Sequence, residues 1–258
     1  MSGLVRLDPA SFDRVRAFVP HGIGHVTFSL GVLEGRMPGQ VWADDQEEPR
    51  TAIVMSDADF CLAFGEPRAD LVRESLPAMI AENRAEKPEL WATTDEWAAA
   101  LAFLGGHRRR NEYHFAGLPP GAGKALPAGY RLVAIDLSVA RMFEGAVDPW
   151  VVNTVWGGPE RFVEQAFGWA VLAAGGNLAS FCAVCAIGGG EAEVEIGTNP
   201  EHRRRGLALA AGAPFIEDCL ARGLTPAWTC ASGNAGSERL AELLGFAFVR
   251  TVTGYALR

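Results

Sequence analysis

One long stretch of the chain, residues 168–190, contains no charged side chain. By length alone, such a stretch could cross a lipid bilayer as a helix. However, Gly175-Gly176-Asn177 lies in its middle, and this tripeptide is typical of a turn between two strands. The segment after the turn, residues 178–187, is apolar on both faces, as expected of a strand covered on both sides of a sheet. The stretch therefore predicts a buried β-hairpin and a protein without a membrane partner.

The sequence around this hairpin predicts a succession of strands and helices. Strands are expected at residues 130–136, 192–198, 225–230, 247–252 and 253–257. Helices are expected at residues 137–143, from Pro159 onward, at residues 206–222 and at residues 235–244. We therefore expect a mixed α/β fold with one central sheet in this part of the chain.

A stretch rich in proline and glycine, residues 117–129, is the best candidate for a linker. It predicts an N-terminal α/β domain of residues 1–120, a linker of residues 121–129 and a second domain of residues 130–258, each domain being large enough to fold separately. In the first part, residues 41–45 and 51–55 predict paired strands, whereas residues 71–84 and the segment that opens at Thr93-Thr94-Asp95-Glu96 predict helices. The basic run His107-Arg108-Arg109-Arg110 is interpreted as a solvated loop or an interdomain contact.

Charge and cysteine usage restrict the function classes. The net charge of −8 argues against general nucleic-acid binding, which needs a basic surface. Five cysteines are an odd number, which fits a reducing compartment better than a disulfide framework. Because the first residues also lack the apolar run of a signal peptide, we expect a cytoplasmic protein. Cys182-x-x-Cys185 has no second pair, so no metal site is expected.

The most informative segment for function is residues 197–208, which joins the end of a strand to the start of a helix through a loop with three arginines. The first amides of a helix have no acceptor within the helix and carry a positive dipole end. Gly206 leaves the backbone open to a ligand, and the arginines add phosphate donors. The segment therefore favours a phosphate or pyrophosphate site. From charge alone, a solvated basic loop is an equal alternative.

Arg203-x-x-Gly206-x-Ala208 after a strand resembles the acyl-CoA pyrophosphate loop of the GNAT-type N-acetyltransferases. Asn234-x-x-Ser237 followed by Leu244-Gly245-Phe246 is similar to the second signature of this family, in which an Asn opens a helix that ends in Gly-Phe. The resemblance covers roughly residues 129–258 and extends to a bacterial subgroup with an extra N-terminal domain. It implies a GNAT-like mixed central sheet flanked by helices, with a smaller N-terminal α/β domain that is compatible with a degenerate copy of the same fold.

The resemblance also implies a function and a set of site residues. The protein would be an acyltransferase that moves an acetyl group from the co-substrate acetyl-CoA directly to a primary amine of a small acceptor. The backbone of Ile196, Gly197 and Thr198 would pair with the pantetheine arm and polarise the thioester carbonyl, while Asn234 and Ser237 would face the pantetheine or the sulfur. The CoA pyrophosphate would be held by the loop and helix start: Arg203, Arg204, Arg205, Gly206, Leu207 and Ala208.

A base is needed to take the proton from the attacking amine. The alternation of residues 192–198 puts Glu193 and Glu195 on one face of a strand. One interpretation is that this face is simply solvated; the other is that one carboxylate is the base, with Glu195 favoured because it lies closer to the expected thioester position. A β-bulge would change which face each residue occupies.

The sequence departs from the family at Ala241, where many members carry the Tyr that protonates the departing thiolate. Ser237, a water molecule or Tyr255 are the candidate replacements, and a non-catalytic acyl-CoA-binding protein is the alternative function. A third hypothesis is an interaction module whose arginine loop contacts an acidic partner. The N-terminal domain would form a wall of the acceptor pocket or a contact between two copies of a homodimer.

Overall fold

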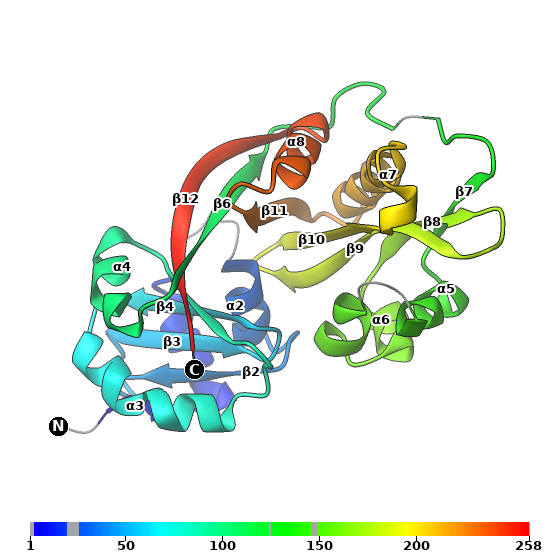
Figure 1. Ribbon diagram of the computed structural model, residues 1–258. Helices are drawn as coiled ribbons and strands as arrows, with labels where there is room; N and C mark the ends of the chain where they lie inside the picture. The colour runs from blue at the N-terminus through cyan, green and yellow to red at the C-terminus, as the bar shows by residue number, and fades with distance from the viewer. Residues whose placement is uncertain (1–2, 20–25, 124, 146–148, 258) are drawn as a thin grey trace.

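The computed structural model describes residues 3–19, 26–123, 125–145 and 149–257. Residue 124 of the predicted linker and the outermost residues of both predicted domains lie outside these ranges. The described strands form one 12-stranded mixed sheet in the order β1-β2-β3-β4-β5-β12-β6-β11-β10-β9-β8-β7 (Figure 1). The α/β architecture with a large mixed sheet and flanking helices is confirmed.

The elements of the first half of the chain are β1 (Val5–Arg6), α1 (Phe12–Arg16), α2 (Val26–Leu33), β2 (Gly39–Ala43), β3 (Thr51–Ser56), β4 (Phe60–Gly65), α3 (Ala69–Glu82), β5 (Glu89–Ala92), α4 (Asp95–Leu101) and β6 (His107–Phe115). Those of the second half are β7 (Tyr130–Ala134), α5 (Leu137–Arg141), the π-helical segment η4 (Trp150–Val155), α6 (Pro159–Gln165), β8 (Gly168–Ala173), β9 (Leu178–Gly188), β10 (Glu191–Thr198), α7 (Leu207–Ala221), β11 (Thr225–Ala231), α8 (Ala235–Leu243) and β12 (Phe246–Ala256). Short 3-10 turns lie at Pro9–Ser11, Ala102–Leu104, Met142–Gly145 and Pro200–His202.

The two halves repeat one order of elements. In the first half, three antiparallel strands β2, β3 and β4 lead through α3 to β5, which is parallel to β4, and then through α4 to β6. In the second half, β8, β9 and β10 lead through α7 to β11, parallel to β10, and through α8 to β12. The first half is therefore a smaller copy of the second.

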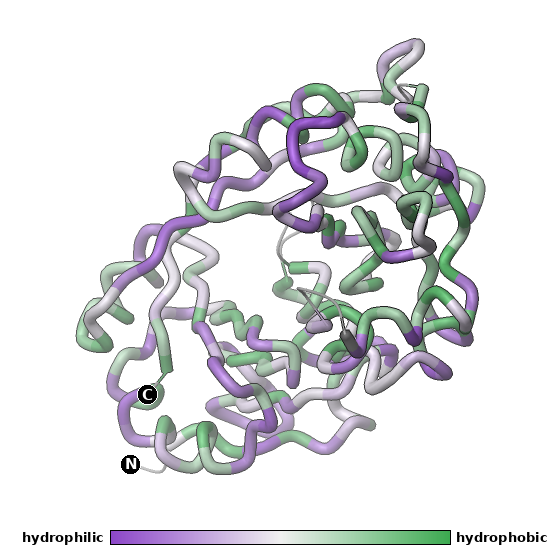
Figure 2. Tube along the Cα trace, turned by 45° about the vertical axis from the view of Figure 1, so that its right-hand side comes forward, coloured by the Kyte–Doolittle hydropathy of each residue, from purple (hydrophilic) through white to green (hydrophobic). Residues whose placement is uncertain are grey.

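The last strands of the two halves are exchanged. β6 of the first half lies between β11 and β12, while β12 of the second half lies between β5 and β6. Both views place the end of the chain among the elements of the first half, and Figure 2 shows β6 in hydrophilic colour as it crosses between the halves (Figure 1, Figure 2). Each half thus completes the sheet of the other.

This arrangement corrects two expectations. The chain from residue 247 to 257 is not two strands, because β12 continues through a bulge between Phe248 and Arg250 and no turn interrupts its pairing with β6. The basic run at residues 107–110 is not a loop but the start of β6, where the pairing with β12 fixes an extended backbone. Its interpretation as a contact between the halves is correct.

The uncharged stretch forms the predicted hairpin of β8 and β9. Residues 179–186 of β9 are all buried, because α7 covers one face while α2, α5, α6 and η4 cover the other (Figure 1). α2 from the first half comes so close that a Cβ on Gly31 would lie 2.8 Å from the carbonyl oxygen of Ile187. Among the described residues, no helix combines the length and apolar character that a membrane crossing requires.

Candidate functional site

The parallel strands β10 and β11 part from each other near their middle. Pairing between them runs only from Glu191 to Glu193 on β10, whereas β10 stays paired with β9 up to Thr198. Beyond Glu193, the edge of β10 that faces β11 pairs with no other strand that the structure describes. A cavity of about 1310 Å³ occupies this opening and extends between α7 and α8.

All the predicted site residues except Glu193 and Arg205 line this cavity. Those that line it are Glu195, Ile196, Gly197, Thr198, Arg203, Arg204, Gly206, Leu207, Ala208, Asn234 and Ser237. The fold therefore brings together, in one space, segments that are up to about forty positions apart along the sequence.

The open edge of β10 presents backbone amides to the cavity. The amide of Asn199 donates to the carbonyl oxygen of Ala179 on β9, and residues two apart on a strand point their amides the same way. The polar backbone groups of Gly197 therefore face β9, while the amides of Ile196 and Thr198 face the opening. Gly197 serves a different purpose, because a Cβ there would lie 2.5 Å from the ring of Phe181.

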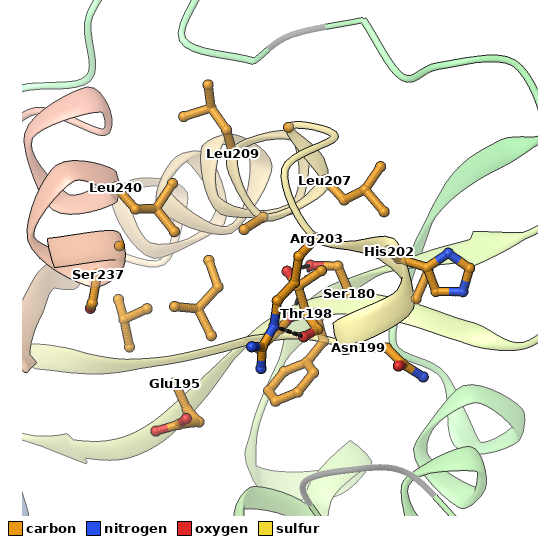
Figure 3. A pocket seen from close by; sticks show the side chains of 18 of the residues that line it. Ser180, Glu195, Thr198, Asn199, His202, Arg203, Leu207, Leu209, Ser237 and Leu240 are labelled. Atoms are coloured by element: carbon orange, nitrogen blue, oxygen red, sulfur yellow. Dashed lines mark hydrogen bonds between the residues drawn. The ribbon is translucent and has the colours of Figure 1, made fainter. Parts of the chain in front are cut away.

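The loop between β10 and α7 holds the predicted anion-binding features. Arg204 and Gly206 adopt left-handed backbone angles, with φ of 60° and 78°, and Gly206 occupies the N-cap of α7 without a side chain to cap it. The first amides of this 15-residue helix are therefore open to a ligand. Arg203 folds back so that its Nε donates to the carbonyl oxygen of Thr198 at 3.2 Å (Figure 3). Arg205 turns away, and its guanidinium lies 6.0 Å from the ring centre of Tyr130.

The two candidate carboxylates occupy different environments. Glu195 lines the cavity and lies on the side of β10 away from α7 (Figure 3). Glu193 is 2% exposed, and its Oε1 accepts hydrogen bonds from the amide and the hydroxyl of Thr229 on β11, at 3.0 and 2.8 Å. Burial raises the pKa of Glu193 to about 8, against the opposing effect of these hydrogen bonds. Whether either carboxylate acts as the base stays a prediction.

The α8 side of the cavity carries Asn234 and Ser237. The Oδ1 of Asn234 accepts from the amide of Ser237 and thereby caps α8, so Asn234 fixes where this helix begins. Ala241 is fully buried, away from the cavity lining. Tyr255 is not near the site, because β12 carries it into the first half, where its hydroxyl donates to the carbonyl oxygen of Ala98 at 2.6 Å. The prediction that Tyr255 could protonate the departing thiolate is therefore wrong.

The cavity lining includes residues that sequence reasoning did not single out for the site, among them Arg110, Ser180 and Thr229. Arg110 comes from β6 of the first half, while Ser180 and Thr229 come from β9 and β11. The basic run at residues 107–110 was the available signal for Arg110, but its meaning depends on the exchange of β6 into the second half, which no local pattern shows.

The corresponding edge in the first half is closed by side chains. The indole nitrogen of Trp97 donates to the carbonyl oxygen of Gly65 at the end of β4, and the hydroxyl of Thr93 donates to that of Ala63. Trp97 is fully buried. The first half therefore repeats the strand order without the open edge.

No group of three or more metal-ligating side chains occurs within the part of the chain that the structure describes. The five cysteines are all buried and free. Burial raises the pKa of the Cys230 thiol, which disfavours the thiolate needed by a nucleophile.

Comparison with known proteins gives a consistent family. Residues 13–255 match the family model described as GNAT acetyltransferase. The chain is 28% identical over 240 residues to the uncharacterized N-acetyltransferase YdfB of Bacillus subtilis (strain 168), covering 90% of this chain and 89% of that protein. It is 29% identical over 189 residues to an uncharacterized N-acetyltransferase of Streptomyces virginiae, covering 71% and 75%.

Solved structures show the same fold. A GCN5-related N-acetyltransferase-like protein from Streptococcus suis 89/1591 superposes with a TM-score of 0.77 at 23% identity, covering 96% of this chain and 99% of that one. A tandem GNAT protein from the clavulanic acid biosynthesis pathway superposes with a TM-score of 0.57 at 15% identity, covering 99% and 98%. The two-half architecture thus has counterparts among known folds.

Proposed function

The chain belongs to the GNAT acetyltransferase family, whose members use acetyl-CoA, and from this premise we propose that it transfers the acetyl group of acetyl-CoA directly to a primary amine of a small acceptor. The observation that carries the proposal is the unpaired edge of β10 beyond Glu193, which leads directly to the uncapped start of α7. A donor with an amide-bearing arm and a pyrophosphate would match both features in one extended pose.

The fit to the donor rests on the chemistry of the groups that are present. Backbone amides at the start of α7 suit a pyrophosphate, and Arg203 and Arg204 add positive charge at the cavity wall. The amides of Ile196 and Thr198 would pair with the carbonyl oxygens of the pantetheine arm, as an added strand pairs with a sheet edge. A thioester carbonyl placed beside such an amide would be polarised toward attack.

The reaction would then proceed without an acyl-enzyme. The nitrogen of the acceptor forms a bond to the thioester carbon, the carbon–sulfur bond breaks, and the ammonium proton passes to Glu195 or to water near it. Thiolate is a good leaving group near neutral pH, so the absence of a Tyr at position 241 does not prevent turnover. Of the two predicted side chains that could protonate the thiolate, Ser237 lines the cavity and Tyr255 does not.

Calorimetric titration with acetyl-CoA and dephospho-CoA tests the donor site, and release of CoA in the presence of a panel of primary amines tests the reaction. Micromolar binding together with amine-stimulated release supports the proposal. Binding without release by any amine would instead support the non-catalytic acyl-CoA-binding alternative, and absence of binding would remove the donor assignment.

A further inference from the structure

Arg110 is a residue of the first half that reaches the candidate site of the second half. It lies on β6, opposite Ala231 of β11, and it lines the cavity that Glu195 also lines. Its Nη2 donates to the hydroxyl of Thr229 at 3.0 Å, diagonally across the β6–β11 pair. The strand exchange therefore places a permanent positive charge below the point where β10 and β11 part.

The surroundings of Arg110 differ from those of comparable arginines. Three of the described arginines, Arg68, Arg110 and Arg250, are half-buried. Arg68 pairs with Asp70 at 2.8 Å and Arg250 pairs with Glu112 at 2.7 Å. No carboxylate of a described residue lies within ion-pair distance of Arg110. Taking a charge out of water without a partner costs free energy. A bound anion would offset this cost at a half-buried arginine of this kind.

The neighbouring acids do not supply that anion. Glu89 forms its ion pair with Arg108 at 2.6 Å, and Glu112 forms its own with Arg250. Glu193 shares Thr229 with Arg110, but its raised pKa of about 8 leaves this carboxyl mostly protonated at neutral pH. Glu89 and Glu193 interact with Arg110 electrostatically. No described carboxylate forms a direct ion pair with it.

Some hydrogen-bond donors of Arg110 have no acceptor among the described residues. Only Nη2 has acceptors among the described residues, the carbonyl and hydroxyl oxygens of Thr229. Nε is buried without a partner there, and no described residue accepts from Nη1. A guanidinium has five N–H donors, and the two on Nη1 are the ones available to an incoming group.

Aromatic rings hold the guanidinium in place. Its central carbon lies 5.0 Å from the ring centre of Phe60 and 5.8 Å from that of Trp91. Phe60 in turn stacks on Phe28 of α2 at 4.4 Å and lies 6.5 Å from Trp150 of the second half. These rings pack against the guanidinium, while apolar side chains such as Phe181, Val194 and Leu240 line the cavity itself. An acceptor with an organic body would therefore fit beside Arg110.

We propose that Arg110 binds a carboxylate of the acceptor, so that the acceptors are small amines that also carry a carboxylate, as amino acids do. This inference rests on the proposed function, because it concerns the second substrate of the same site. The carboxylate would lie against Arg110 while the amine lies toward Glu195 and the open edge of β10. A singly charged carboxylate is favoured over a phosphate, because the carboxylate of Glu195 on the cavity wall would repel a dianion more strongly.

A binding experiment without turnover tests this recognition directly. The protein is saturated with CoA and titrated with the N-acetyl derivatives of glycine, alanine, phenylalanine and glutamate, each beside its primary amide and beside N-acetyl phosphoethanolamine. We expect at least one acid to bind about tenfold or more tightly than its amide. Equal affinity of every acid and its amide, no binding by any acid, or preference for the phosphate compound would overturn the inference.

Matched variants assign the effect to Arg110. Arg110→Gln should reduce the preference for acid over amide to about one while leaving the acetyl-CoA affinity unchanged. Arg109→Gln removes the exposed neighbouring charge and should keep the preference. Arg110→Lys, which keeps the charge, should retain part of the preference and serves as the informative variant if the Gln variant does not fold, as judged by its thermal unfolding. An equal loss for acids and amides in these variants would indicate a structural role and overturn the inference.

Turnover separates this inference from the proposed function. Release of CoA is measured with amino acids and with their amides. If amides are acetylated as fast as acids, the proposed function stands and the carboxylate preference fails. If nothing is acetylated while acids bind in an Arg110-dependent manner, the proposed function fails and the anion site stands.

Discussion

Thr229 holds the carboxyl group of Glu193 at the point where β10 and β11 part, donating to the same Oε1 from its amide at 3.0 Å and from its hydroxyl at 2.8 Å. Glu193 therefore takes the place of a strand neighbour for Thr229, and the pairing of the two strands ends there rather than continuing toward Thr198. The cavity begins where this change of partner occurs. Glu193 acts on the shape of the site even though it does not line it.

The raised pKa of Glu193 predicts a pH dependence of stability. Its pKa is 4.5 when exposed and about 8 in the folded protein, so the folded state binds the extra proton in this range. The resulting stabilisation is complete below pH 4.5 and is lost as the pH rises through about 8. Between pH 5 and 8, this group should make the free energy of unfolding of the wild type fall by about 1.4 kcal/mol per pH unit. Glu193→Gln should lack this contribution, as measured by denaturant unfolding at a series of pH values. Identical slopes in the two proteins would contradict the assignment.

Gly206 tests the donor site at the start of α7. Both Gly206→Ala and Gly206→Arg pay the cost of a side chain at a φ of 78°, but only the arginine fills the space before the helix amides. We expect the alanine variant to bind acetyl-CoA nearly as well as the wild type. The arginine variant should bind it about a hundredfold more weakly, a loss of about 2.7 kcal/mol in binding free energy. Calorimetry measures both, and equal affinities of the two variants would remove the donor from this place.

Gly197 is required by the ring of Phe181. Gly197→Ala would put a Cβ 2.5 Å from Cε1 of that ring, so β10 or the ring must shift, at a cost of about 1–3 kcal/mol of stability. The shift would also move the amides of Ile196 and Thr198 and weaken donor binding. In Gly197→Ala with Phe181→Leu, part of the stability should return, as seen in denaturant unfolding. Additive losses in the double variant would show that the two residues do not compete for space.

Glu195 is the predicted base, and its replacement should affect the reaction without affecting the donor. Glu195→Gln keeps the size of the side chain and should lower kcat/KM about a hundredfold or more while the affinity for acetyl-CoA stays the same. A profile of kcat/KM against pH completes the test, because the ascending limb due to the base should disappear. Full activity of the variant at every pH would show that water, and not Glu195, accepts the proton of the amine.

The sequence was informative where one segment carries its own signal. The turn at Gly175-Gly176 predicted the hairpin, and the loop from Arg203 to Gly206 predicted the helix start that now borders the cavity. Pairing between distant strands has no such local signature. The exchange of β6 and β12, the burial of Glu193 by Thr229 and the arrival of Arg110 at the site all follow from that pairing. Local pattern therefore predicted most elements of the second half and the loop before α7, but not the residues that the first half contributes.

The exchanged strands predict that the two halves depend on each other for folding. A fragment of residues 130–258 would lack β6, which lies between β11 and β12, and would expose the unpaired edges of both strands. It would also lose the burial of β9 under α2, whose eight residues are all buried. We expect this fragment to be unfolded or aggregated on its own, as measured by circular dichroism and size-exclusion chromatography, and to become soluble when residues 1–120 are co-expressed with it. The intact chain should accordingly unfold in one transition by both heat and denaturant. A fragment that folds alone with a sharp melting transition, or two separate transitions in the intact chain, would show that β6 is dispensable to the second half and that the shared sheet does not couple the halves.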